Sequence, residues 1–165
     1  MHRVSMTALC SVFIACTAAS NSAADQSDKD ITLGEVESTL EQCGIGCPAG
    51  NHAASFECSF NCGSCLFNNN QTICESNNGT FLSCGTCPAG WHPTRFMLQL
   101  ACNISLFSTS ADPNQSVCEP NSGSFLTCGG CPPGWHATST LFDPGCNISA
   151  FSTSTNPNKS VCAPN

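Results

Sequence analysis

The feature that most constrains this chain is an internal repeat of its cysteines with a period of 44 residues. Residues 84–120 align with residues 128–164 without a gap, and both follow the pattern C-x2-C-x14-C-x15-C. Each copy opens on C-G-x-C-P-x-G-W-H, continues with C-N-I-S and ends on P-N-x-S-V-C followed by x-P. A sequence that repeats at such a period predicts a row of equivalent units, each packed against its neighbours.

A third copy, residues 43–74, precedes these two and differs from them. Its opening pair, CGIGC, has one additional residue, and its last cysteine comes four residues early. It also contains two cysteines that the other copies lack, Cys58 and Cys65, and we expect these two to bond to each other. The copies then hold six, four and four cysteines, and these even numbers predict that every bridge stays within its own copy.

The N-terminal segment has the order of a secretory signal peptide. A basic start at Arg3 precedes an apolar run that is too short to cross a bilayer, and small residues follow up to Ser22-Ala23-Ala24. We therefore predict a signal peptide over residues 1–24, secretion to the extracellular space, and no membrane span in the mature chain.

Removal of the signal peptide takes Cys10 and Cys16 and leaves fourteen of the sixteen cysteines. This density is typical of a secreted disulfide scaffold. We predict that all fourteen are disulfide-bonded: Cys43, Cys47, Cys58, Cys62, Cys65, Cys74, Cys84, Cys87, Cys102, Cys118, Cys128, Cys131, Cys146 and Cys162. Four cysteines allow three pairings, and the sequence does not choose among them, although we expect each cysteine of an opening pair to bond to a distant one.

The composition argues against nucleic acid and anionic membranes as partners, and it provides few residues for an apolar core. Three Lys and Arg remain against eleven Asp and Glu, a net charge of −8, so no basic surface is available for nucleic acid or an anionic membrane. With no Tyr and two Trp, the chain cannot build a large apolar core. We predict a small disulfide-rich fold of three tandem cysteine-rich modules, with short β-hairpins and loops and little helix.

The predicted organisation has five parts. After the signal peptide, residues 25–42 form an acidic, polar leader, and the modules occupy residues 43–74, 84–118 and 128–162. The stretches GTFLSC, GSFLTC, TICES and SVCEP favour short strands, since apolar and β-branched residues there are bounded by Asn-Gly, Ser-Gly and Pro-Gly turns.

The opening pair allows two chemical interpretations besides a structural one. CGTC and CGGC have the form of a thiol oxidoreductase dithiol, but each unit is too short for a thioredoxin-like frame, and proline follows directly. The pair and the histidine that follows it (His52, His92 or His136) also have the spacing of a metal half-site, but oxidised cysteines are poor zinc ligands. A turn histidine stacked on its neighbouring tryptophan is the simpler interpretation, and we predict no metal and no cofactor.

Catalysis by other side chains is not indicated. The acidic residues do not recur at corresponding places, because Glu75 and Glu119 match but the third copy has Ala163. No nucleophile-elbow pattern is present. We predict no catalytic residues and a protein that is not an enzyme.

Asparagine sequons are the most informative polar feature. Three of them lie four residues before the last cysteine of each copy, and two directly follow the third cysteine of copies two and three. The N-x-S/T candidates for glycosylation are Asn70, Asn78, Asn103, Asn114, Asn147 and Asn158.

The opening motifs also resemble a known class of extracellular repeat. CGTCPAGWHPT and CGGCPPGWHATS, preceded by GTFLS and GSFLT, resemble the C-x-x-C-P-x-G stretch of ephrin-receptor-like and EGF-like cysteine-rich repeats. The resemblance covers about a dozen residues in each module, and it implies a non-catalytic spacer or binding module outside the cell.

We therefore expect a secreted protein with a structural or recognition role, whose partner is an extracellular protein or a glycan, with self-assembly also open. Trp91, His92, Trp135 and His136 are the candidate partner contacts, since aromatic residues on rigid turns are common anchors. The alternative for each tryptophan is packing on a disulfide inside its own module. A second class of function is a secreted effector, toxin or protease inhibitor, acting through the divergent loop 94–101 or 138–145.

Overall fold

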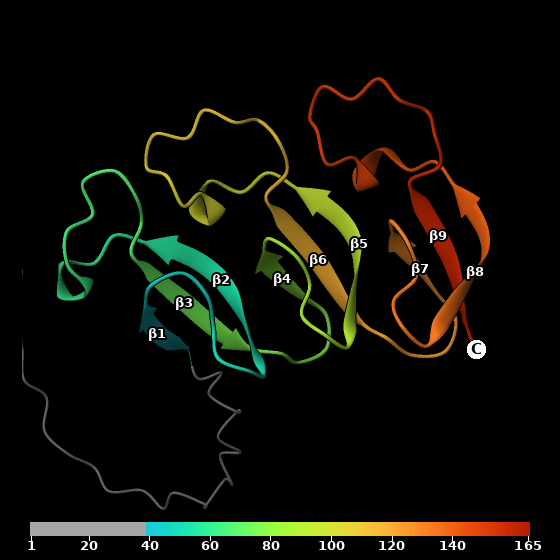
Figure 1. Ribbon diagram of the computed structural model, residues 1–165, viewed down its shortest axis with the longest axis horizontal. Helices are drawn as coiled ribbons and strands as arrows, with labels where there is room; N and C mark the ends of the chain where they lie inside the picture. The colour runs from blue at the N-terminus through green and yellow to red at the C-terminus, as the bar shows by residue number, and fades with distance from the viewer. Residues whose placement is uncertain (1–38) are drawn as a thin grey trace, which may run out of the picture. The chain divides into compact units, whose positions relative to one another are not determined.

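The computed structural model describes residues 39–165 and contains three small antiparallel sheets in sequence (Figure 1). Each sheet has three strands, and the only helices in these residues are three short 3-10 turns, so the predicted small disulfide-rich fold is confirmed. The predicted signal peptide and most of the acidic leader lie outside the described residues. Within residues 39–165 no helix has the length and apolar character needed to cross a membrane.

Each repeat contributes one sheet, and its last strand lies in the middle. The sheets have the strand orders β1-β3-β2, β4-β6-β5 and β7-β9-β8. The strands are β1 (Leu40–Cys43), β2 (Asn51–Glu57), β3 (Gln71–Ser76), β4 (Phe81–Cys84), β5 (Trp91–Met97), β6 (Gln115–Pro120), β7 (Phe125–Cys128), β8 (Trp135–Leu141) and β9 (Lys159–Pro164). The 3-10 turns are η1 (Phe60–Cys62), η2 (Leu100–Cys102) and η3 (Pro144–Cys146).

The strands extend beyond the cysteines that bound each module in the sequence. The predicted strands at GTFLSC, GSFLTC, TICES and SVCEP are present as β4, β7, β3 and β6. Residues 40–42, which we assigned to the acidic leader, instead form most of β1, because they pair with β3 in the register Leu40 to Cys74.

The second strand of each sheet was not predicted from the sequence. Residues of mixed polarity, such as WHPTRFM in β5, form these strands, and each has a bulge at its third to fifth residue. Pro93 is tolerated in β5 because β5 is an edge strand, where one side of the backbone needs no ladder hydrogen bond.

The C-P-x-G motif is the turn that leads into this second strand. In repeat 2 the N–H of Trp91 donates to the carbonyl of Pro88 over 3.1 Å, and Gly90 adopts a φ of +91°. A positive φ at the third turn position favours glycine, so the motif fixes where the strand begins. The same turn occurs in repeats 1 and 3.

The disulfides have one pairing rule in all three repeats. The first cysteine of the opening pair bonds to the cysteine that ends the 3-10 turn, and the second bonds to the last cysteine of the repeat. The bridges are Cys43–Cys62 and Cys47–Cys74, Cys84–Cys102 and Cys87–Cys118, and Cys128–Cys146 and Cys131–Cys162. The structure also pairs Cys58 with Cys65, as the parity of the cysteines predicted. The cysteines of an opening pair are therefore not bonded to each other.

The bridges also form the core. Among residues 39–165, every buried apolar side chain is a cysteine, and Cys74, Cys118 and Cys162 are fully buried at the centres of the three sheets. Cross-links thus take the place of the aliphatic core that a chain of this composition lacks. Seven disulfides indicate an oxidising, extracellular type of environment.

Candidate recognition surfaces

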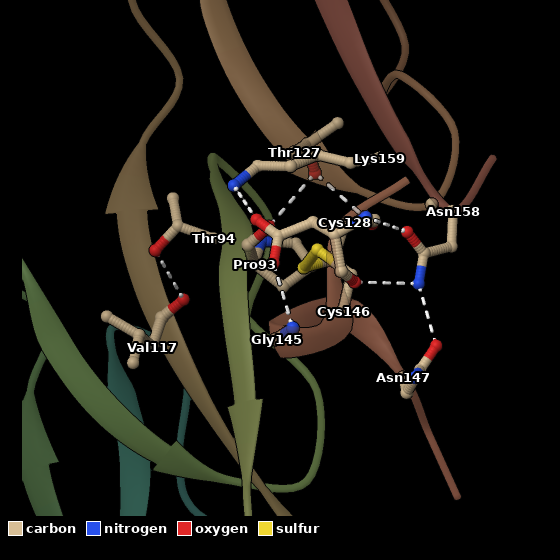
Figure 2. The surroundings of a disulfide bond; sticks show 12 residues. Pro93, Thr94, Val117, Thr127, Cys128, Gly145, Cys146, Asn147, Asn158 and Lys159 are labelled. Carbon is tan, nitrogen blue, oxygen red and sulfur yellow. Dashed lines mark hydrogen bonds and ion pairs between the residues drawn. A yellow bond between two sulfur atoms is a disulfide. The ribbon is translucent and has the colours of Figure 1, made fainter. Parts of the chain in front are cut away.

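An aromatic contact joins each repeat to the next. The ring of His92, on β5, stacks on the ring of Phe125, on β7, with centroids 3.9 Å apart and planes 15° apart. Trp135, from the same repeat as Phe125, lies against that ring at 5.5 Å and 53°. The hydroxyl of Thr127 also donates to the carbonyl of Pro93 over 3.2 Å (Figure 2). We call this group of contacts the aromatic joint.

The first two repeats are connected by the same ring contacts. His52, on β2, stacks on Phe81, on β4, with centroids 4.0 Å apart and planes 16° apart. Trp91 lies against Phe81 at 5.6 Å and 53°. A histidine from one repeat and a Phe–Trp pair from the next therefore form a contact that occurs twice in the chain.

A hydrogen bond sets the orientation of each histidine. The Nδ1 atom of His92 lies 3.0 Å from Oδ1 of Asn121, and Glu119 is its cross-strand neighbour on β6. The His92 residue is 2% exposed, and burial lowers its pKa, although Asn121 and the charge of Glu119 act in the opposite direction. Burial thus favours the neutral form of His92.

The four residues predicted as partner contacts differ in their exposure. His92 is buried between two repeats and cannot contact a partner, whereas His136 is exposed. Our expectation that each histidine stacks on its neighbouring tryptophan was wrong, because His92 stacks on the phenylalanine of the next repeat. Trp91 and Trp135 are half-buried, and their indole N–H groups donate to the carbonyls of Gly79 and Gly123.

A shallow groove lies between the two tryptophans. It has a volume of about 460 Å³, and Trp91 and Trp135 line it together with Pro88, Pro132 and Pro133. Each tryptophan that lines the groove also contacts a phenylalanine of a joint, so the groove lies beside the joints.

A larger apolar surface lies on the segments that link the second and third strands of each sheet. We call residues 58–70, 98–114 and 142–158 the connectors, which are the long loops above the sheets in Figure 1. Of the sixteen large hydrophobic residues exposed in residues 39–165, eleven lie on the connectors. They are Phe60, Leu66, Phe67, Leu98, Leu100, Ile104, Leu106, Phe107, Phe142, Ile148 and Phe151.

Neighbouring connectors contact one another. The rings of Phe67 and Phe107 lie 6.3 Å apart, and Asn68 forms an antiparallel bridge with Ser105. Between the second and third connectors, Oδ1 of Asp112 accepts the N–H of Ala150 over 3.1 Å. The exposed apolar residues therefore belong to one continuous set of loops.

An asparagine holds the base of each connector. In repeat 2, Oδ1 of Asn114 accepts the N–H of Gln99 over 2.8 Å, and its Nδ2 donates to the carbonyl of Gln99 and to Oδ1 of Asn103. In repeat 3, Asn158 makes the same three contacts to Asp143 and Asn147 (Figure 2). We call this arrangement the asparagine clamp.

Asn70 forms the corresponding clamp in repeat 1, with Ser59 and Gly63. The clamp changes how the sequons are interpreted. An N-linked glycan replaces one hydrogen of Nδ2, and in the three clamp asparagines both of these hydrogens are in use. Asn103 and Asn147 engage only Oδ1 in the clamp, and Asn78 is exposed. These last three remain the candidates that a glycan can occupy without loss of a clamp hydrogen bond.

The predicted inhibitory loops are not free loops. Residues 94–101 contain the end of β5 and the start of η2, and Arg95 lies against Gly145 of η3, where an added Cβ would be 3.2 Å from Nε of Arg95. In the segment 138–145, Asp143 pairs with Lys159 at 2.7 Å, and this ammonium group lowers the pKa of Asp143. Both segments contribute to the contact between repeats 2 and 3.

Sequence reasoning did not find the connectors as a surface. The signal was present, because Leu66-Phe67, Leu106-Phe107 and Phe151 recur at corresponding places in segments otherwise rich in Ser, Thr and Asn. Within residues 39–165 no three His, Cys, Asp or Glu side chains are grouped to hold a metal ion.

The comparisons with known proteins found no match. No family model, no curated protein and no solved structure is similar to this chain at a significant level. They therefore add no support to the resemblance to ephrin-receptor-like and EGF-like repeats, and the functional argument rests on the surfaces described above.

Proposed function

We propose that this is a secreted, non-catalytic recognition protein in which three disulfide-stabilised repeats present an apolar connector surface to an extracellular protein. The observation that carries the proposal is the exposure of Phe67, Phe107 and Phe151, which are 68%, 69% and 82% exposed on corresponding connectors. Exposed apolar patches on soluble proteins often mark contact surfaces, and Phe67 and Phe107 lie 6.3 Å apart.

The base of this surface is rigid. Each connector is anchored by a disulfide from its 3-10 turn to the first strand and by the asparagine clamp. A loop that is already ordered loses little conformational entropy on binding, so aromatic residues on it are effective anchors. The predicted signal peptide supports secretion, and the sequons at Asn78, Asn103 and Asn147 support glycosylation of the same protein.

An extracellular protein fits this surface better than a glycan does. Sugars are held by polar side chains around an aromatic platform, whereas the large side chains that the connectors expose include eleven of leucine, isoleucine and phenylalanine. The groove between Trp91 and Trp135, with Asn121 beside it, is the place where a glycan would compete as the ligand.

The test is a binding screen with the disulfide-intact protein against an array of extracellular protein domains and an array of glycans. A variant with Phe67→Ser, Phe107→Ser and Phe151→Ser should lose at least tenfold in affinity for its protein ligand. Trp135→Ala, which alters the groove and not the connectors, should leave that affinity unchanged. Protein binding that survives the triple substitution, or binding confined to glycans and lost with Trp135→Ala, would contradict the proposal.

The protease-inhibitor class can be tested separately. Arg95 is exposed, but it lies on a strand, β5, beside Gly145 of the next repeat and not on a free loop. We expect no inhibition across a panel of serine and cysteine proteases. Inhibition that is lost on Arg95→Ala would favour the inhibitor instead.

A further inference from the structure

Among residues 39–165, one histidine half of the aromatic joint, on β8, is uncovered, and so is the first strand of repeat 1, β1; repeat 1 has Leu40 and Asn51 in place of the Phe–Trp pair. The histidine half is formed by β2 in repeat 1 and β5 in repeat 2, and the next repeat covers both. The third such strand, β8, carries His136, and six of its seven residues are exposed. The corresponding strands β2 and β5 are mostly half-buried, with their histidines 4% and 2% exposed.

The ring of His136 is already oriented for stacking. Its Nδ1 lies 3.1 Å from Oδ1 of Asn165, and the equivalent distances for His52 and His92 are 3.2 Å and 3.0 Å. The hydrogen bond that holds the two stacked rings is therefore present in repeat 3 as well. The carbonyl of Ala137 occupies the place of the Pro93 carbonyl, which accepts from Thr127 in the joint.

The receiving half is formed by the first strand of each sheet. β4 and β7 are covered by the preceding repeats, but all four residues of β1 are exposed. By sheet register, Leu40 opposes Cys74 as Phe125 opposes Cys162, so Leu40 takes the place of the joint phenylalanine. Gln42 takes the place of Thr127 and brings an amide donor to the position from which Thr127 reaches the Pro93 carbonyl.

The charged residue of β1 does not obstruct this contact. Glu41 corresponds to Leu82 and Leu126, and both of these are exposed on the far side of the joint strands. The carboxylate of Glu41 accepts a hydrogen bond from Nε2 of Gln71 over 2.8 Å within its own sheet. The strand β1 thus presents an apolar residue at the phenylalanine position and a side-chain donor where the joint between repeats 2 and 3 has one.

We propose that β8 of one molecule binds β1 of a second copy of this chain, in the geometry of the aromatic joint. The template for the contact is inside the molecule twice, and both missing halves lie on edge strands of the same chain. The contact joins two different surfaces. A pair of molecules therefore keeps a free β1 at one end and a free β8 at the other, and association continues into linear oligomers. Leu40 in place of phenylalanine makes this contact weaker than the internal joints.

Sedimentation velocity of the disulfide-intact protein over a range of concentrations tests the proposal. The average mass should rise with concentration, and Leu40→Phe should raise the association constant about fivefold, the order expected for one added aromatic pair. His136→Ser should reduce association, whereas Leu106→Ser, on a connector, should leave it unchanged. Association that depends on Leu106 and not on His136 would overturn the proposal, as would a monomer at every concentration for both wild type and Leu40→Phe.

A mixing experiment tests the head-to-tail geometry. Leu40→Glu blocks one end and His136→Glu blocks the other, so each variant alone should remain a monomer. Their equimolar mixture should form a dimer and nothing larger, because one complementary pair of ends remains. A variant that still associates alone, or a mixture that stays monomeric while wild type associates, would refute a β8-to-β1 contact. Near-ultraviolet circular dichroism of each variant confirms that the sheets are intact.

Discussion

Replacing Phe125 by alanine should weaken the structure through the joint between repeats 2 and 3. The substitution removes the ring that lies between His92 and Trp135. Full burial of a phenylalanine stabilises a protein by up to about 3 kcal/mol, so the half-buried Phe125 contributes about 1.5 kcal/mol. Its two ring contacts add about 0.5 kcal/mol each, which gives a loss of about 2.5 kcal/mol in the free energy of unfolding.

Urea denaturation with the disulfides intact measures this loss. Tryptophan fluorescence is a suitable signal, because Trp135 contacts the deleted ring. With an m-value of about 2 kcal/mol per M, the midpoint should fall by about 1 M. In hydrogen exchange, the amides of β7, β8 and the facing strand β5 should exchange faster in Phe125→Ala than in the wild-type protein.

Two further variants make the prediction specific. Leu126→Ala alters the next residue of the same strand, which is exposed, and should cost less than about 0.5 kcal/mol. Phe81→Ala removes the equivalent ring of the first joint and should cost about as much as Phe125→Ala. If Leu126→Ala and Phe125→Ala are equally destabilising, or if Phe81→Ala has no effect, the joint does not hold the repeats together as we argue.

Four other predictions follow from the described contacts. Because burial lowers the pKa of His92, the folded protein binds fewer protons than the unfolded chain, so stability is complete above about pH 6.5 and falls below it; urea midpoints from pH 8 to pH 5 should show the fall, and His92→Gln should remove most of it. Asn114→Ala deletes the clamp of repeat 2 and should cost about 2 kcal/mol in urea denaturation, whereas Asn78→Ala should cost nothing measurable. Mass spectrometry of the protein from a glycosylating host should find glycan on Asn78 and none on Asn114, and the reverse would mean that the clamp does not form. Replacing Cys58 and Cys65 together by serine should cost about 2.5 kcal/mol from the loop that this bridge closes, measured by thermal or urea unfolding.

The repeat and the local strands could be predicted from the sequence because both depend on short-range patterns. The spacing of the cysteines defines the 44-residue unit, and the alternation in Phe81-Leu82-Ser83-Cys84 places two side chains on each face of a strand. Parity was sufficient to pair Cys58 with Cys65 because both cysteines are additions to one repeat.

The aromatic joint could not be predicted in this way. His92 and Phe125 are separated by most of a repeat, and their contact depends on how one sheet packs on the next. The stretch that contains Phe125 was predicted as a short strand but placed between two modules, whereas it is the first strand of the following sheet. The neighbouring Trp91 was the obvious stacking partner for His92 in sequence, but adjacent residues of a strand point to opposite faces.

The asparagine clamp was not predicted because the asparagine that forms it also lies in a glycosylation sequon. Asn114 lies in an N-x-S sequon, and its regular place before the last cysteine suggested a glycan site. Its side chain instead holds the backbone of Gln99, a contact across the connector that no local pattern indicates. The β5 strand was missed for a related reason, since bulged edge strands of mixed polarity have no clear two-residue period.

The aromatic joint also affects how such a chain can gain or lose a whole repeat. Any 44-residue segment taken across repeats 2 and 3 contains one joint histidine, one joint phenylalanine and one joint tryptophan, wherever the cut is made. Deletion of residues 81–124 would place Phe125 after repeat 1, where His52 could receive it as it now receives Phe81. In-frame duplication or loss of one such segment therefore creates a complete joint in a single genetic event. Repeat 1 is the exception, since Leu40 and Asn51 stand where the other two repeats have the aromatic pair.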